Sequence, residues 1–167
     1  LLGRCPDELP FFMSFDDPEM GAVLISGNSG CGKTHQLQVM VESAMRTHRP
    51  HELQITVITH QPSEWLAIQR DNPYLKYLQG VFAWYDPRLD ANIQRLTDVA
   101  EARRQGHHEG PATLVVLDDM GFVEVLSCEA QVNLRWLLEY GSQSRVWLVG
   151  AINALQELPG GELKWQM

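Results

Sequence analysis

The segment Gly27–Thr34, GNSGCGKT, is the feature that most restricts how this chain can fold. It matches the pattern G-x-x-x-x-G-K-[ST], which requires a strand before it and a helix after it. Its glycines permit backbone angles and close approaches that side chains would block. Successive N–H groups can then point inward, and the helix N-terminus adds to their attraction for an anion. The motif therefore predicts a phosphate site made of Gly27, Asn28, Ser29, Gly30, Cys31, Gly32, Lys33, Thr34 and His35.

The residues around this motif have the strand and helix patterns that it needs. The apolar run 22–26 predicts a buried strand, and apolar spacing over 33–47 predicts a helix. Further along, strand and helix patterns alternate, which is typical of an α/β fold with a mainly parallel sheet covered by helices on both faces. We expect a lead-in over 1–20 that is irregular apart from a short strand near 10–15. The other expected strands are 55–59, 81–85, 112–117 and 146–149, and the other expected helices are 63–69, 87–104 (with Asp86 as N-cap) and 128–140 (with Ser127 as N-cap).

A second signal is the apolar strand 112–117, which ends in the carboxylates Asp118 and Asp119. In a P-loop enzyme an acidic residue at such a strand end holds Mg²⁺, so we assign Asp118 and the Thr34 hydroxyl to the metal. Lys33 would reach the β- and γ-phosphates of the nucleotide. Asp119 is then the candidate base for the attacking water. A pair of solvated turn aspartates is the alternative interpretation.

Two further candidates lie near the last expected strand. Asn153 follows it and could contact the γ-phosphate or the water, although an ordinary loop asparagine fits equally well. Arg145 precedes it and could act as a finger toward a neighbouring subunit's nucleotide, although a solvated arginine is the simpler interpretation. Arg88 and Arg135 remain undecided, and the pair at 107–108 is expected to be an exposed loop. Trp65, Trp84, Trp136 and Trp147 lie in apolar stretches and are expected in the core or at an interface.

Charge, cysteine content and hydropathy bound the remaining possibilities. The 167 residues, of which 44% are hydrophobic, predict a single domain over 1–167. The net charge of −8 excludes a general basic coat for nucleic acid. Three widely spaced cysteines argue against a disulfide framework or a zinc site and favour a reducing, cytoplasmic compartment. No apolar run is long enough to span a membrane, and a chain that starts at Leu1 is expected to be part of a longer protein.

Motifs outside the phosphate loop indicate which family of P-loop proteins the chain resembles. No Asn-Lys-x-Asp guanine reader and no arginine-rich lid is present, and the acidic pair on a separate strand favours ATPases that hydrolyse through a carboxylate. The chain resembles the FtsK–HerA superfamily of ring-forming motor ATPases in its approach to the P-loop over 2–27, its turn THQPSE at 59–64, and the helix, turn and strand at 137–149. The resemblance implies a RecA/ASCE-like P-loop NTPase, a three-layer sandwich that binds ATP and Mg²⁺.

The same resemblance implies a hexameric ring that moves a polymer through its pore. That polymer is usually double-stranded DNA, or a secreted protein in the secretion branch. Three departures bear on the hydrolysis rate: the pair is Asp118-Asp119 rather than Asp-Glu, Asn153 or Gln156 must replace the usual glutamine, and Arg145 must replace the usual arginine of the turn. Two interpretations stay open, namely a hydrolysing DNA motor domain and a weakly or non-hydrolysing assembly module of a type VII-like secretion ATPase.

Overall fold

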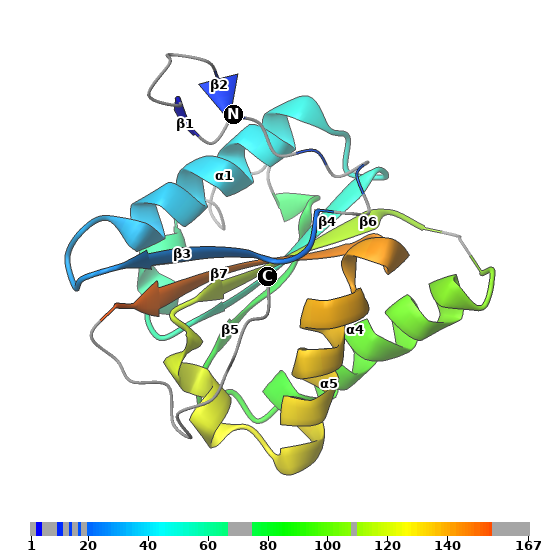
Figure 1. Cartoon of the computed structure of the whole chain (residues 1–167). Helices are drawn as coiled ribbons and strands as arrows, with labels where there is room; N and C mark the ends of the chain where they lie inside the picture. Colours follow the sequence, from blue (N-terminus) through cyan, green and yellow to red (C-terminus); the bar gives the residue numbers. More distant parts are fainter. Residues whose placement is uncertain are drawn as a thin grey trace.

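The structure is a computed structural model (Figure 1) that describes residues 20–66, 75–107 and 110–154, with positions 3–4, 10–11, 14 and 17. Its centre is a five-stranded sheet in which all neighbouring strands are parallel. All five strands therefore end at the same edge of the sheet, which is where ligands bind in folds of this kind. In spatial order the strands are β3 (Val23–Gly27), β7 (Val146–Asn153), β6 (Ala112–Asp118), β4 (Leu53–Thr59) and β5 (Leu78–Ala83).

Helices cover both faces of the sheet (Figure 1). Helix α1 (Lys33–Thr47) packs on one face, where its apolar stripe joins alternate residues of β4, β6 and β7 in one core cluster. Helices α4 (Leu89–Arg104) and α5 (Cys128–Tyr140) pack on the other face over a second cluster. Side chains alternate between faces along a strand, so each central strand contributes to both clusters. The predicted α/β sandwich of three layers is thus confirmed.

The last strand of the described chain, β7, lies between β3 and β6. It pairs with β3 through the register Gly27 to Asn153 and with β6 through the register Leu117 to Gly150. On the other side of β6, Asp118 lies opposite Thr59 of β4. The ends of β3, β7, β6 and β4 therefore stand side by side, although they come from distant parts of the sequence.

Helix α4 begins later than its sequence signal indicates. The pair Asp86-Pro87 predicts a helix from residue 87, but the helix starts at Leu89 and Arg88 is its N-cap. The Asp86 carboxylate does not cap the helix. It accepts hydrogen bonds from the backbone N–H of Arg88 at 2.9 Å and from Nη2 of the Arg88 guanidinium at 2.7 Å. An aspartate that bonds its own neighbouring backbone competes with helix formation in this way. By contrast, Ser127 caps α5 as predicted and accepts the N–H of Ala130 at 3.2 Å.

Strand β7 is longer than predicted, because it continues through Gly150 to Asn153 instead of ending at Val149. Pairing with β3 keeps the strand regular to its last residue. Asn153 is consequently the end of a strand rather than a loop residue. Strand β5 spans Leu78–Ala83 instead of 81–85, and the short helix predicted at 63–69 is the 3₁₀-helix η1 (Pro62–Trp65), with 67–69 outside the described residues.

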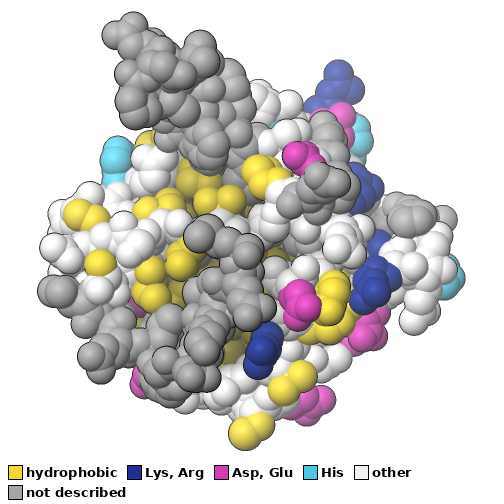
Figure 2. Space-filling model, viewed as in Figure 1, with side chains coloured by type: hydrophobic (Ala, Val, Ile, Leu, Met, Phe, Trp, Pro, Cys, Tyr) yellow, Lys and Arg dark blue, Asp and Glu magenta, His cyan; other side chains and the backbone are white. Residues whose placement is uncertain are grey.

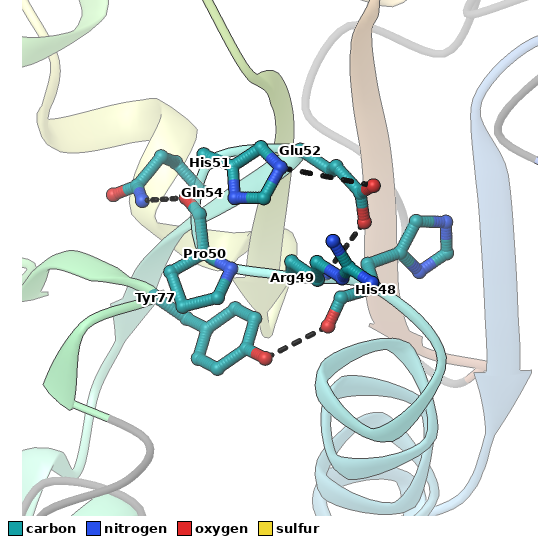
Figure 3. A network of polar contacts seen from close by, with 7 residues as sticks. All are labelled: His48, Arg49, Pro50, His51, Glu52, Gln54 and Tyr77. Atoms are coloured by element: carbon teal, nitrogen blue, oxygen red, sulfur yellow. Dashed lines mark hydrogen bonds and ion pairs between the residues drawn. The ribbon is translucent and has the colours of Figure 1, made fainter.

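Hydrogen bonds hold the turn between α1 and β4, which lies at the end of the sheet where the strands begin (Figure 3). The Tyr77 hydroxyl donates to the carbonyl of His48 at 2.7 Å, and Gln54 Nε2 donates to the carbonyl of Pro50 at 2.6 Å. The backbone N–H of Arg49 donates to the Glu52 carboxylate at 2.7 Å, which lowers the pKa of Glu52. These bonds fix the start of β4 against the end of α1.

Strand β3 forms an edge of the described sheet and is covered by α1 on one face. On its other face Leu24 remains 45% exposed, and Figure 2 shows hydrophobic side chains gathered on this side of the molecule. In the lead-in, β1 (Gly3–Arg4) and β2 (Pro10–Phe11) pair antiparallel. The strand predicted near 10–15 has its start in β2, and most of its remaining positions lie outside the described residues. Within the described ranges no helix has the length and apolar character needed to cross a bilayer.

Candidate functional site

The loop between β3 and α1 has the conformation that its glycines permit. Gly30 has φ 77° and Gly32 has φ 88°, in the left-handed region where side chains are strained. Gly32 is the N-cap of α1 and has no side-chain cap. The first N–H groups of a helix lack partners within the helix and attract anions. The loop and the start of α1 therefore have the geometry of an anion-binding turn, which is the geometry that the motif predicts.

Lys33 lies at the first position of α1 and folds back over the loop. Its Nζ donates to the carbonyls of Gly27 and Asn28, both at 2.9 Å. The ammonium is thereby held beside the same backbone whose N–H groups form the turn. A lysine supplies a compact positive charge for phosphate, and its position here fits that use.

The two sequence signals meet at Thr34 and Asp118. The Thr34 hydroxyl donates to Oδ1 of Asp118 at 2.8 Å, across 84 residues of sequence. Asp118 is the last residue of β6, and its side chain points to the α1 face because side chains alternate along the strand. The structure thus brings together the two residues that the sequence assigns to the metal.

The Asp118 carboxylate is buried, with 6% of the residue exposed. Its second oxygen, Oδ2, accepts the Thr59 hydroxyl at 3.0 Å and the indole N–H of Trp65 at 3.0 Å. A buried carboxylate is costly unless hydrogen bonds compensate its lost hydration, and these donors supply that compensation. The sequence analysis missed both roles. Trp65 was expected in the core or at an interface, and its complete burial places it in the core, whereas Thr59 was noted only as part of a turn.

Asp119 has an unusual backbone conformation, with φ 79° and ψ 113°. Strict alternation would direct its side chain to the face opposite that of Asp118. Instead both aspartates line the same cavity. Its Oδ1 also accepts the N–H of Gly121 at 3.0 Å, which caps the 3₁₀-helix η2 (Met120–Val125). Positive φ at a non-glycine residue is a strain that clusters at functional sites, and here it accompanies the presence of Asp119 in the cavity lining.

A cavity of about 400 Å³ lies at the carboxyl ends of the strands and contains these groups. This volume is in the range of small-molecule sites, roughly 300–1,000 Å³. Gly27, Asn28, Cys31 and His35 were predicted for the phosphate site but are not in the cavity lining, and no sequence signal assigned His60, Gln61, Glu64 or Ala151 to it. The lining consists of Ser29, Gly30, Gly32, Lys33, Thr34, Thr59, His60, Gln61, Glu64, Asp118, Asp119, Ala151 and Asn153.

The oxygen ligands in this cavity suit a hard cation such as magnesium. Mg²⁺ binds through one or two carboxylates with phosphates and water, rather than in an all-protein cage. Thr34 and Asp118 provide a hydroxyl and one carboxylate at the foot of the phosphate loop. No group of three or more His, Cys, Asp or Glu residues in the described part of the chain could hold a metal ion.

Arg145 lies far from this cavity, because it precedes β7 at the opposite end of the sheet. It has φ 58°, is exposed, and donates from Nη1 to the carbonyl of Gly110 at 3.3 Å. The buried Arg103 fixes this turn, since its Nη1 donates to the carbonyls of Ser144 and Arg145 at 3.1 Å each. Burial, and then the charge of Arg145, lower the pKa of Arg103.

The remaining sequence candidates are also outside the cavity. Arg88 is paired with Asp86, and Arg135 is exposed on α5. His107 is exposed, as expected, while His108 and Gln156 lie outside the described residues. Trp147 is buried, which confirms its core assignment, whereas Trp84 and Trp136 are half-buried.

Comparison with known proteins agrees with this geometry. The FtsK/SpoIIIE family model matches residues 10–70, the part that holds the phosphate loop, α1 and β4. Among curated proteins the sequence search found no match. The fold is similar to Thermomonospora curvata EccC (ATPases 2 and 3) in complex with a signal sequence peptide, at TM-score 0.70 and 16% identity over 87% of this chain and 27% of that one. It is also similar to EssC (ATPases 2 and 3) from Geobacillus thermodenitrificans, at TM-score 0.71 and 17% identity over 86% of this chain and 30% of that one.

These comparisons confirm the resemblance to P-loop ATPases of the FtsK–HerA superfamily. At 16–17% identity the structural matches establish the fold alone. The chain spans under a third of the length of these structures.

Proposed function

We propose that this chain is a P-loop ATPase domain that binds and hydrolyses Mg²⁺-ATP as part of a motor. The observation that carries the proposal is the 2.8 Å bond between Thr34 and Asp118. It joins the phosphate loop to the acidic strand at the place where a nucleotide's metal would bind. A glycine-rich turn alone would give only an anion site, and an acidic strand end alone would give only solvated carboxylates.

Each group of cavity residues has a separate role in the proposed reaction. The loop amides and Lys33 bind the phosphates, and Thr34 with Asp118 hold Mg²⁺. The metal supplies positive charge that neutralises the developing charge on the phosphate oxygens. We assign the attacking water to Asp119, which is among the residues that line the cavity. Asn153, in register with Gly27 at the mouth of the loop, is the polar residue proposed to contact the γ-phosphate or the water.

The FtsK–HerA resemblance supports a ring of several copies that translocates double-stranded DNA. The net charge of −8 does not oppose this, because a ring gathers a few pore residues from every subunit. In such a ring Arg145 would act on a neighbouring subunit's nucleotide, which its distance from its own cavity permits. We propose a cytoplasmic location and a single ATPase domain over 1–167.

A second candidate function is favoured by the structural matches. The EccC and EssC chains are described as containing ATPases 2 and 3, and one is bound to a signal sequence peptide. By analogy this chain would be a nucleotide-binding assembly module of a type VII-like secretion ATPase, with little or no turnover. The aspartate at position 119, one methylene shorter than the usual glutamate, supports slow hydrolysis.

Magnesium-dependent ATP turnover, with and without double-stranded DNA, tests both candidates. Lys33→Ala should lose ATP binding, whereas Asp119→Asn should keep binding and lose about 100-fold or more in turnover. Lys76→Ala and Asp98→Asn are matched controls, because both residues are exposed and outside the cavity. Turnover that is unchanged in both site variants would refute the proposal that this cavity hydrolyses ATP. Stimulation by DNA would support the DNA motor, and tight binding without turnover would favour the assembly module.

A further inference from the structure

The two oxygens of the Asp118 carboxylate have separate sets of partners. Oδ1 accepts the Thr34 hydroxyl at 2.8 Å. Oδ2 accepts both Thr59 and Trp65, each at 3.0 Å. A carboxylate that is held through one oxygen by two donors cannot rotate freely. The other oxygen is thereby fixed in its direction toward the phosphate loop.

The chemistry of the two partners fixes the direction of both hydrogen bonds: Thr59 and Trp65 donate, and Oδ2 accepts. An indole N–H can only donate. The Thr59 hydroxyl accepts the backbone N–H of Gln61 at 3.1 Å, so its own hydrogen is directed to Asp118. Both donors are buried, with Trp65 at 0% and Thr59 at 1% exposed.

The donors come from the end of β4 and from η1, and this segment is also joined to α1. Gln38 Nε2 of α1 donates to the carbonyl of Glu64 at 2.9 Å. The 3₁₀-helix η1 is therefore attached both to the helix that starts with the phosphate loop and to the metal-binding carboxylate. Rotation of Asp118 would require η1 to move away from α1 or to break the indole bond.

We propose that Thr59 and Trp65 are positioning residues that hold Oδ2 of Asp118, so that Oδ1 is presented to the Mg²⁺ of a bound nucleotide. This inference rests on the proposed function of the same cavity. Groups that orient a metal ligand typically contribute about 10- to 100-fold to metal affinity. Removing either donor should therefore weaken the Mg²⁺ contribution and leave the phosphate-loop contribution in place.

The test measures binding rather than turnover. A fluorescent N-methylanthraniloyl-ATP is titrated into the whole chain in EDTA, and then at increasing Mg²⁺. Trp65→Phe keeps an aromatic ring and removes the N–H, while Thr59→Val keeps the shape and removes the hydroxyl. Both variants should bind the nucleotide in EDTA like the wild type, but need about tenfold more Mg²⁺ for half-maximal enhancement.

Two control variants separate positioning from general destabilisation. Trp147→Phe makes the same change in the same core cluster, away from the cavity, and should keep the wild-type Mg²⁺ requirement. Thr59→Ser restores a hydroxyl and should return the requirement to near the wild-type value. The threonine pair keeps the test decisive if Trp65→Phe fails to fold.

The outcomes distinguish this inference from the function on which it rests. If the wild type shows Mg²⁺-dependent binding and Trp65→Phe and Thr59→Val match Trp147→Phe, the inference is overturned and the proposed function stands. If Thr59→Ser is as impaired as Thr59→Val, the hydroxyl is not the cause and the inference is also overturned. If the wild type binds no nucleotide, the proposed function and this inference fall together.

Discussion

The backbone at Asp119 allows a prediction of stability that needs no nucleotide. Asp119 adopts φ 79° and ψ 113°, a sparsely populated backbone region that costs a non-glycine residue about 1–3 kcal/mol. Replacing Asp119 by alanine keeps this strain and removes the bond from the Gly121 N–H. Replacing it by glycine also removes that bond but relieves the strain. The two variants therefore differ mainly in backbone conformational preference.

Glycine has an opposing cost, because the unfolded chain gains freedom worth roughly 0.5–1 kcal/mol relative to alanine. The strain relief exceeds this cost, so Asp119→Gly should be more stable than Asp119→Ala by about 1 kcal/mol. For a chain of this size that difference corresponds to a shift of about 2–4 °C in Tm. Both variants lack the carboxylate and should lose turnover equally.

The assay is urea or thermal unfolding of the two variants, with Asp98→Ala and Asp98→Gly as the matched control pair. Asp98 is exposed in the interior of α4, where its Oδ1 accepts Gln94 Nε2. At that position alanine should be more stable than glycine by about 1 kcal/mol. The order of the two variants is thus opposite at the two sites. If Asp119→Ala equals or exceeds Asp119→Gly in stability, the backbone strain at Asp119 is refuted.

Two other predictions concern regions outside the cavity. A Cβ at Gly141 would collide with the backbone carbonyls of Leu137 and Val146, so Gly141→Ala should destabilise the fold by about 2 kcal/mol or more in urea unfolding. Gly21→Ala, with nothing within 4 Å of its Cβ, should be neutral, and equal stability of the two variants would contradict the packing at Gly141. The hydrogen bond from Arg88 lowers the pKa of Asp86 to about 2 from 3.8. Because this folded-state pKa is depressed, the pair's small stabilisation is present above about pH 4 and is lost as the pH falls toward 2. The Tm difference between wild type and Asp86→Asn should therefore shrink over that interval and also with added salt, and a difference that persists at pH 2 would contradict the assignment.

Much of the site's backbone could be predicted because its signals are local. The glycines of the loop permit the positive φ that Gly30 and Gly32 adopt, and helix α1 begins at Lys33 and ends at Thr47 as its apolar spacing predicts. The strand that ends in Asp118 is recognisable by its continuous apolar run. Where two local signals competed, prediction was less accurate. Asp86 has the residue type of an N-cap but bonds to Arg88, and the helix begins later.

The partners of Asp118 could not be predicted in the same way. Trp65 is a core residue by every sequence criterion, and its burial agrees. Its donation to Oδ2 depends on a strand and a 3₁₀-helix that approach across 53 residues. Asn153 likewise seemed to follow a strand, because Gly150 interrupts the apolar run. Pairing with β3 is what extends the strand to that residue.

The sequence by itself determined the phosphate loop, the helix behind it and the acidic strand, since each follows from backbone preferences and side-chain periodicity within one segment. Only the tertiary structure decided which of these segments meet. The insertion of β7 between β3 and β6, the approach of Thr34 to Asp118, and the two donors on Oδ2 all depend on packing between segments far apart in the chain. Burial is the physical reason for the last of these, because a carboxylate removed from water must take its hydrogen bonds from whichever donors the fold places beside it.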